Sequence, residues 1–304
     1  MRFPFTKMQG CGNDFIVIDH RAGAPAGFHL TPELAAKLSH RQFGVGCDQI
    51  LWLKAALDPG VARARVVILN ADGSEAEMCG NGMRALAVFL GERRSGRDGR
   101  DQSFQVESRS GLVEMTLAGK YPSVRLGTPK VLNSREKISL SRPDSVGSGS
   151  NSRPSAPDSS SSHVRSDFLF ARVDMGNPHA VFFLPNAAFG KFSELDLAGW
   201  GKLVEHHPAF PNRTNVEFVE IESRVKLHVR VWERGAGATL ACGSGACAVV
   251  AAAEALGHTA PGAEVEVVLP GGSVFVKLEA GWESGQGRVH LAGPAEKVFT
   301  GEWL

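Results

Sequence analysis

Residues 70–90 read NADGSEAEMCGNGMRALAVFL, and residues 233–253 read ERGAGATLACGSGACAVVAAA. Each stretch begins with a polar residue at the end of an apolar run and reaches Cys-Gly-x-Gly nine positions later, at Cys79 and Cys242. An Ala-rich apolar segment follows each motif, and such a segment is typical of a buried helix. The pattern therefore predicts that each cysteine lies at, or just before, the N-terminus of a buried helix.

The repetition extends outward from the two motifs. Gly12-Asn13 and Asp48-Gln49 precede the first motif, and Gly176-Asn177 and Thr214-Asn215 precede the second in the same order. Corresponding positions along the series are separated by 163 to 166 residues. A near-constant offset over several matches indicates two duplicated lobes.

An apolar strand is predicted ahead of each motif. Residues 65–69 are mostly β-branched over a length that suits a buried strand, and residues 225–232 alternate as a half-buried strand does. Strands followed by buried helices in both halves predict an α/β (α+β) fold with two pseudo-symmetric lobes.

The composition narrows the class of function. The length of 304 residues suits two domains, and a net charge of +1 gives no basic excess that would favour a nucleic-acid or membrane partner. The N-terminus lacks the features of a signal peptide, and the longest apolar run, residues 246–253, is too short to cross a bilayer. We therefore expect a cytoplasmic protein. Five cysteines without a C-x-x-C pair argue against a disulfide framework or a structural zinc site.

A serine-rich segment separates the two halves. Ten of the 22 residues from Ser141 to Ser162 are serine, and such a composition buries too little apolar surface to order the chain. We therefore expect a flexible connection over residues 131–167, an N-terminal lobe over residues 1–130 and a C-terminal lobe over residues 168–293.

The two motifs together suit proton transfer at one carbon atom. A helix N-terminus flanked by glycines presents backbone N–H groups that bind a carboxylate and favour a thiolate over a thiol. Two such sites facing each other would hold one α-carboxylate and place a sulfur on each side of the adjacent α-carbon. One thiolate then removes the α-proton while the opposite thiol returns a proton, which inverts the centre. The N–H groups would stabilise the intervening enediolate.

Two simpler interpretations compete with this one. A cysteine in an apolar sequence is usually a small buried hydrophobe, and we expect this role for Cys11, Cys47 and Cys247. The glycines that follow Cys79 and Cys242 also fit a loose dinucleotide-binding pattern. That pattern opens directly from a strand, whereas nine residues intervene here, so nucleotide binding is disfavoured.

Five blocks of the sequence resemble the signature motifs of the diaminopimelate epimerase family. They are KMQGCGNDFIVID (7–19), NADGSEAEMCGNGMRA (70–85), GNPHAVFF (176–183), RTNVEFV (213–219) and WERGAGATLACGSGACA (232–248). The resemblance implies an isomerase that interconverts LL- and meso-2,6-diaminopimelate without metal or pyridoxal phosphate. It also implies a place in lysine biosynthesis and in the supply of peptidoglycan precursors.

The resemblance implies roles for individual residues as well. Cys79 and Cys242 would be the two catalytic bases, and His179 and Glu233 would tune or orient their thiols. The residues that would bind the substrate are Asn13, Gln49, Asn70, Gly80, Asn81, Asn177, Asn215, Glu233, Arg234, Gly243 and Ser244. Among them, Arg234 suits bidentate contact with the distal carboxylate.

The fold that the resemblance implies has a sheet wrapped around a central helix in each lobe, with the active site in the cleft between the lobes. The last strand, residues 294–304, would return to the N-terminal lobe, and the protein would be a homodimer. Two residues depart from the family's pattern. Cys11 adds a thiol whose nearness to Asn13 leaves open a reactive role, and Phe299 stands where relatives often have a tyrosine at the dimer contact.

Two other functions stay open at this point. A related two-cysteine racemase of proline, hydroxyproline or histidine would use the same pair of bases. Proline-type relatives have Cys-Gly-His and Pro-Cys-Gly-Thr-Gly, however, where this chain has CGN at 79–81 and ACGSG at 241–245. A non-catalytic thiol protein with a redox or metal-binding role would show no hydrogen exchange at a substrate α-carbon.

Overall fold

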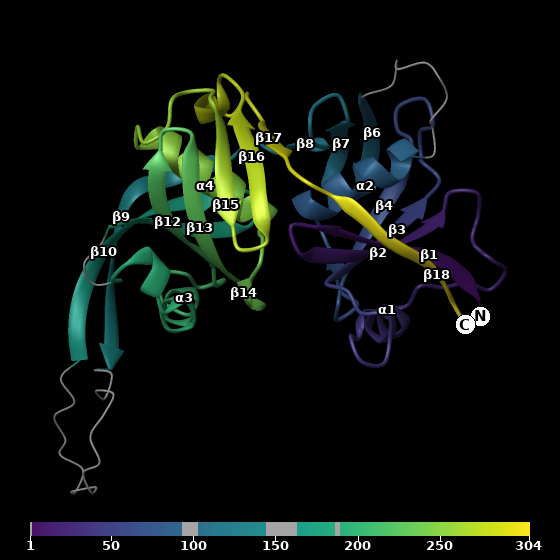
Figure 1. Cartoon of the computed structure of the whole chain (residues 1–304), viewed down its shortest axis with the longest axis horizontal. Helices are drawn as coiled ribbons and strands as arrows, with labels where there is room; N and C mark the ends of the chain where they lie inside the picture. Colours follow the sequence, from purple (N-terminus) through teal and green to yellow (C-terminus); the bar gives the residue numbers. More distant parts are fainter. Residues whose placement is uncertain (1, 93–102, 144–162, 186–188) are drawn as a thin grey trace, which may run out of the picture.

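The computed structural model describes residues 2–92, 103–143, 163–185 and 189–304. Figure 1 shows two lobes side by side, each with a curved sheet around one central helix. The predicted fold class, α/β (α+β) with two pseudo-symmetric lobes, is confirmed.

The strands of the N-terminal lobe pair in the order β1-β2-β3-β4-β6-β7-β8, and β5 forms a short hairpin with β4. Neighbouring strands are antiparallel except β2–β3 and β4–β6, which are parallel. The elements are β1 (Phe3–Gly10), β2 (Asn13–His20), α1 (Pro32–Ser39), β3 (Gln49–Lys54), β4 (Arg65–Asn70), β5 (Glu75–Ala76), α2 (Gly80–Glu92), β6 (Ser103–Ser108), β7 (Gly111–Thr116) and β8 (Ser123–Leu126).

The C-terminal lobe repeats this order as β10-β11-β12-β13-β15-β16-β17, with β14 forming a short hairpin with β13. The parallel neighbours again fall at matching places, β11–β12 and β13–β15. The elements are β10 (His163–Asp174), β11 (Pro178–Leu184), η1 (Phe192–Glu194), α3 (Leu197–Glu205), β12 (Asn215–Ser223), β13 (Lys226–Glu233), β14 (Gly237–Thr239), α4 (Gly243–Ala255), β15 (Glu264–Leu269), β16 (Gly272–Leu278), η2 (Trp282–Ser284) and β17 (Val289–Ala292).

The two lobes exchange their final strands. Strand β9 (Lys130–Pro143) follows the N-terminal lobe in sequence but pairs with β10 of the C-terminal lobe. Strand β18 (Glu296–Trp303) follows the C-terminal lobe but pairs with β1. Strands β8 and β17 also pair with each other and join the two sheets. In Figure 1, β18 can be followed from the C-terminal lobe back across the N-terminal lobe.

The expectation of a flexible connection over residues 131–167 is wrong for the parts of it that the structure describes. Residues 131–143 lie in β9 and residues 163–167 lie in β10, and these strands pair antiparallel over most of their length. The reason is an apolar alternation just before the serine-rich segment, which buries Ile138 and Leu140 in the core of the C-terminal lobe. Residues 144–162 lie outside the described residues. The division into domains stays a prediction.

Each sheet wraps around a helix made mostly of small or apolar residues. Helix α2 packs against strands on several sides, among them β1, β2 and β8, and α4 packs against β9 to β12, β16 and β17. Residues 245–253 of α4 are all buried, because glycine, alanine and valine side chains let strands approach a helix from every direction. None of the helices in the described part of the chain is both long and apolar enough to cross a membrane.

Candidate active site

The N-termini of α2 and α4 meet between the two lobes. Helix α2 begins at Gly80 and α4 at Gly243, so Cys79 and Cys242 directly precede the helices, as predicted. A methyl group on Gly80 would lie 4.0 Å from Cα of Gly243, and one on Gly243 would lie 3.2 Å from Oδ1 of Asn81. The glycines therefore allow two positively polarised helix ends to approach each other closely.

Each cysteine caps its own helix in the same way. The backbone N–H of Gly82 donates to Sγ of Cys79 at 3.3 Å, and that of Gly245 donates to Sγ of Cys242 at 3.3 Å. In both cases the donor lies three residues after the sulfur, as it does for an oxygen at a helix N-cap. The duplicated motif thus places two sulfurs at equivalent positions on the two meeting helix ends.

Side-chain amides line the junction. Nδ2 of Asn81 donates to Oδ1 of Asn13 at 3.4 Å and, across the lobes, to the backbone oxygen of Ala241 at 3.3 Å. Cys79 Sγ also donates to Oδ1 of Asn13 at 3.8 Å. Asp48 in turn accepts a hydrogen bond from Nδ2 of Asn13 at 2.7 Å and fixes its orientation.

A buried histidine and carboxylate lie behind Cys242. Nδ1 of His179 and Oε1 of Glu217 are 2.7 Å apart, and both side chains are fully buried. Nε2 of His179 lies 3.0 Å from Oδ1 of Asn177, whose Nδ2 donates to Ser244 Oγ at 3.4 Å. This chain of contacts connects Glu217 to the first turn of α4.

Glu233 is the carboxylate that acts on both thiols. Its Oε1 accepts a hydrogen bond from Thr239 Oγ1 at 2.6 Å. Burial raises the pKa of Glu233, while hydrogen bonds from Thr239 and Cys242 lower it. The charge of Glu233 in turn raises the pKa of both Cys79 and Cys242. Because it lies in the C-terminal lobe yet affects Cys79, Glu233 is further support for one shared site.

The expectation that the helix ends would favour thiolates is not met in this conformation. Burial raises the pKa of Cys79 to about 11, and burial with the charges of Glu233 and Glu217 raises the pKa of Cys242 well above its ordinary value. The N–H groups of Gly82 and Gly245 lower these pKa values, as predicted, but burial has the larger effect. Both cysteines therefore hold their protons until another group accepts one.

The comparison with known proteins agrees with this geometry. The sequence profile of the family described as "Diaminopimelate epimerase" matches residues 5–132 and 171–298. The chain belongs to the diaminopimelate epimerase family. It is 43% identical to the diaminopimelate epimerase of Synechococcus sp. (strain JA-2-3B'a(2-13)) over 99% of this chain and 98% of that one. It is 40% identical to that of Carboxydothermus hydrogenoformans over 99% of each chain.

Solved structures at lower identity share the fold. A PhzF-family phenazine biosynthesis protein of Bacillus anthracis superposes with a TM-score of 0.68 at 14% identity, covering 100% of this chain and 99% of that one. A hydroxyproline epimerase of Agrobacterium vitis superposes with a TM-score of 0.67 at 16% identity, covering 99% and 92%. At these identities the likeness concerns the fold alone.

The remaining residues that the family resemblance named form two further groups. Nε2 of Gln49 donates to Oδ1 of Asn70 at 2.9 Å, on adjacent strands of the N-terminal lobe. Asn215 accepts a hydrogen bond from the backbone N–H of Arg234 at 2.9 Å and lies beside His179 in the sheet. Arg234 itself is exposed, which suits contact with a charged ligand group. The roles of these residues in binding stay predictions.

Three residues of this site were missed by the sequence patterns. Asp48 appeared only as half of a repeated dipeptide, although it holds Asn13. Glu217 alternates with valine and phenylalanine inside a buried strand, and a carboxylate in such a run is the signal that would have found it. Arg84 lies one turn into an apolar helix and gave the same kind of signal. Cys11 is buried in the turn between β1 and β2, where its sulfur contacts Arg84 rather than a helix N-terminus, and the reactive role left open for it stays a prediction.

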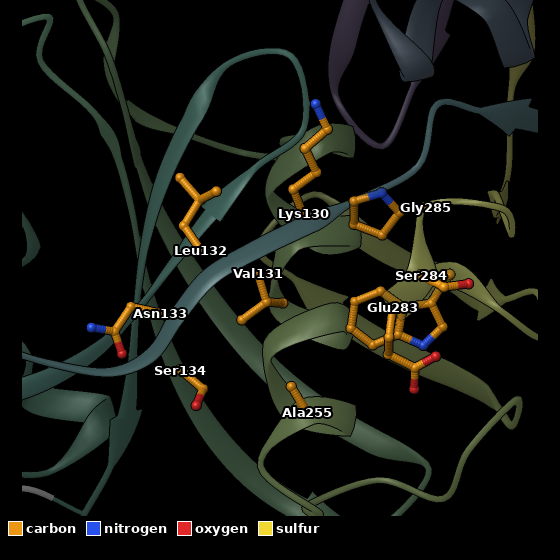
Figure 2. A pocket seen from close by; sticks show the side chains of 11 residues that line it. Lys130, Val131, Leu132, Asn133, Ser134, Ala255, Glu283, Ser284 and Gly285 are labelled. Atoms are coloured by element: carbon orange, nitrogen blue, oxygen red, sulfur yellow. The ribbon is translucent and has the colours of Figure 1, made fainter.

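A large surface hollow lies far from these residues. This cavity has a volume of about 710 Å³. Figure 2 shows that the start of β9, including Lys130 and Leu132, lines one side of it and that Glu283 and Ser284 line the other. Ala255, at the C-terminal end of α4, forms part of its floor. Because α4 begins at the opposite end, beside Cys242, the hollow lies about 18 Å from the thiols. It is therefore not the candidate site.

Proposed function

We propose that this chain epimerises 2,6-diaminopimelate between its LL and meso forms, with Cys79 and Cys242 as the acid/base pair. Family membership supports the substrate. The observation that supports the mechanism is the meeting of the two capped helix ends, which presents two sulfurs to one carboxylate-binding junction. A substrate α-carbon held there has a thiol on each face.

The α-carboxylate binds to the first-turn N–H groups of Gly80, Asn81, Gly243 and Ser244. These groups carry the positive ends of both helix dipoles, and they stabilise the charge that moves onto the carboxylate when the α-proton leaves. The amide of Asn81 strengthens the arrangement, because it already bonds to both lobes. Expulsion of water from a closed site makes these interactions stronger.

Proton transfer begins with loss of a thiol proton. The raised pKa of Glu233 and its hydrogen bond with Cys242 make its carboxylate a suitable acceptor. The Cys242 thiolate then takes the α-proton from one face, and the Cys79 thiol gives its proton to the other face. His179 and Glu217 orient the surroundings of Cys242 in this scheme. The reverse reaction begins with the opposite sulfur.

The distal half of the substrate is recognised by polar groups around the junction. Arg234 binds the distal carboxylate, and the amides of Gln49, Asn70, Asn177 and Asn215 supply donors and acceptors to the two amino-acid ends. Cys242 is buried and Cys79 is half-buried in this conformation, so we infer that the lobes separate to admit substrate and close over it.

We also propose that the protein is a homodimer formed through β18. Within the described residues this strand pairs only with β1, which leaves its other edge available, and Val298 and Phe299 on it are exposed to 56% and 46%. An apolar edge strand of this kind suits pairing with a second copy. Light scattering of the parent and of Val298→Asp tests this, and a parent that is monomeric would reject it. The cytoplasmic location also stays a prediction.

The decisive experiment for the reaction uses the purified, reduced protein in D₂O. With LL-diaminopimelate, we expect the meso isomer to form with deuterium at one α-carbon. Proline and 4-hydroxyproline serve as alternative substrates in parallel. Exchange with these but not with diaminopimelate would assign the chain to the related racemases, and no exchange with any of them would reject an epimerase.

A further inference from the structure

Arg84 is a buried cation for which the reaction scheme above has no use. It lies one turn into α2, the central helix of the N-terminal lobe in Figure 1, and is the largest fully buried side chain among the described residues. No ion pair of Arg84 is formed within the described part of the chain, and its Nε has no hydrogen-bond partner. A charge taken out of water without a carboxylate partner is costly. An anion that arises during function would offset this cost.

The contacts of Arg84 lead directly to the site. Its Nη1 donates to Oδ1 of Asn81 at 2.9 Å, and its Nη2 donates to Sγ of Cys11 at 3.8 Å. Two glycines enclose the guanidinium closely. A methyl group on Gly293 would lie 3.4 Å from Cζ of Arg84, and one on Gly10 would lie 3.6 Å from Nη2. The guanidinium is therefore held in one position.

We propose that Arg84 is a positioning residue of the epimerase site, which orients the Asn81 amide and places a buried positive charge one turn behind the end of α2 at which Cys79 lies. This rests on the proposed function. The amide oxygen of Asn81 is taken by Arg84, so its NH₂ group must point toward Asn13 and Ala241. The charge stabilises the Cys79 thiolate in one direction of reaction and the enediolate in both.

The charges facing the two thiols fit this assignment. Arg84 lowers the pKa of Cys79, whereas Glu233 raises it. The other titratable groups that face Arg84 are Cys11, from the turn between β1 and β2, and Cys247, from α4. For Cys242 the nearby charges are the carboxylates of Glu233 and Glu217. Arg84 therefore acts on one member of the pair.

A test that leaves Arg84 in place uses position 11. Cys11→Asp puts a carboxylate beside the guanidinium, and Cys11→Asn is the neutral control of the same shape. Both residues tolerate the positive φ of 55° at this position. We expect Cys11→Asp to move the midpoint of Cys79 alkylation by iodoacetamide about one pH unit upward and to lower kcat about tenfold. Cys11→Asn should match the parent. An unshifted midpoint and unchanged kcat in Cys11→Asp would overturn the proposal.

Substitution of Arg84 itself gives a second readout. We expect Arg84→Met to lower kcat about 10²-fold with little change in KM and to raise the Cys79 midpoint. Arg84→Lys keeps the positive charge but not the planar guanidinium that bonds to Asn81. The midpoint of Cys79 alkylation should therefore equal that of the parent, while kcat is only partly restored. Equal midpoints in parent, Met and Lys variants that are folded by circular dichroism would contradict the proposal. If Arg84→Met does not fold, the comparison of Cys11→Asp with Cys11→Asn tests the proposal by itself.

The alkylation readout needs no substrate, so the two hypotheses can fail separately. A parent inactive on diaminopimelate with an Arg84-dependent Cys79 profile would reject the proposed function. If the parent is active but the pH dependence of Cys79 alkylation is the same in the parent, the Arg84 variants and the position 11 variants, the role of Arg84 is rejected.

Discussion

Cys79 and Cys242 occupy equivalent positions in the two lobes, yet their electrostatic surroundings differ. The carboxylate of Glu233 raises the pKa of both thiols, but the guanidinium of Arg84 offsets this effect at Cys79, whereas the carboxylate of Glu217 adds to it at Cys242. The position in α4 that corresponds to Arg84, at the same offset of 163 residues, is the buried and uncharged Cys247. The duplication therefore preserved the backbone and the thiols but not the charges around them.

This difference teaches that the two bases are unequal partners. Their backbone geometry is the same, with one N–H donor at 3.3 Å from each sulfur. Their charges decide which sulfur loses its proton more readily and which lies next to a proton acceptor. We therefore expect each direction of the reaction to have its own pH profile, although one pair of sulfurs serves both.

The largest effect should come from removing either sulfur. Cys79→Ala and Cys242→Ala should each lower the rate of epimerisation about 10³-fold, because one face of the α-carbon loses its acid/base group. Deuterium incorporation from LL-diaminopimelate in D₂O measures this. Cys47→Ala is the matched control, since Cys47 is also buried but lies in a separate core cluster of the N-terminal lobe. Full activity in Cys79→Ala or Cys242→Ala would reject the hypothesis that both cysteines act as acid/base groups.

Glu233→Gln should separate thiol acidity from turnover. Loss of this charge should lower the alkylation midpoints of both Cys79 and Cys242, because Glu233 raises the pKa of both. The rate of epimerisation should nevertheless fall about 10²-fold, since Cys242 loses its proton acceptor. Iodoacetamide labelling against pH and steady-state kinetics give the two quantities. If Glu233→Gln showed both faster alkylation and faster turnover, Glu233 would only raise the pKa values of the thiols and would not act as a proton acceptor.

Glu217→Gln should change the pKa of the Cys242 thiol but not that of the Cys79 thiol. Glu217 raises the pKa of Cys242, so we expect the Cys242 midpoint to fall by about one pH unit while that of Cys79 stays unchanged. The measurement is alkylation of each cysteine followed by peptide mass spectrometry. Glu205→Gln is the control, because Glu205 is also buried but bonds to Trp232 and the backbone of Gly235. Equal shifts at both thiols would mean that the two surroundings are not distinct.

The parent protein should show the same asymmetry as a function of pH. The Cys79 thiol should be alkylated at lower pH than Cys242, because Arg84 lowers the pKa of Cys79 whereas Glu217 raises that of Cys242. A thiol whose pKa is higher in the folded state stabilises that state below the unfolded value of about 8.5, and the contribution is lost as pH rises toward 11. Thermal melts across this range should therefore show a falling Tm. The fall should be smaller in Cys79→Ala, and an equal fall would contradict the assignment.

The smallest effect concerns the joint between the lobes. Arg125 on β8 makes two hydrogen bonds to Glu279, at 2.7 and 2.8 Å, beside the β8–β17 pairing that joins the sheets. Arg125 holds the pKa of Glu279 down at about 2, so its contribution is present above the unfolded value of about 4.3 and is lost as pH falls toward 2. Both groups are partly exposed, so Glu279→Gln should lower the stability by about 1 kcal/mol or less near neutral pH. Chemical denaturation measures this, and Glu283→Gln, at an exposed turn, is the control.

The local parts of the site were predictable because they depend on residues close together in the chain. Cys-Gly-x-Gly before an Ala-rich segment is enough to predict a thiol at a helix N-terminus, and both cysteines lie there. The repeated spacing was enough to predict duplicated lobes. The flexible connection was predicted too long because the composition of residues 141–162 was extended to the residues before them, where an alternation places Ile138 and Leu140 in the core.

What the sequence by itself determined is therefore the family, the duplicated fold and the two sulfurs on their helix ends. Only the tertiary structure decided the pairing of β9 with the C-terminal lobe, the contact of Gly80 with Gly243, and the charges that reach each thiol. The physical reason is distance along the chain. Capping and amphipathic patterns act over a few residues, whereas the pKa of a buried thiol is set by every charge near it, whichever strand or helix supplies that charge.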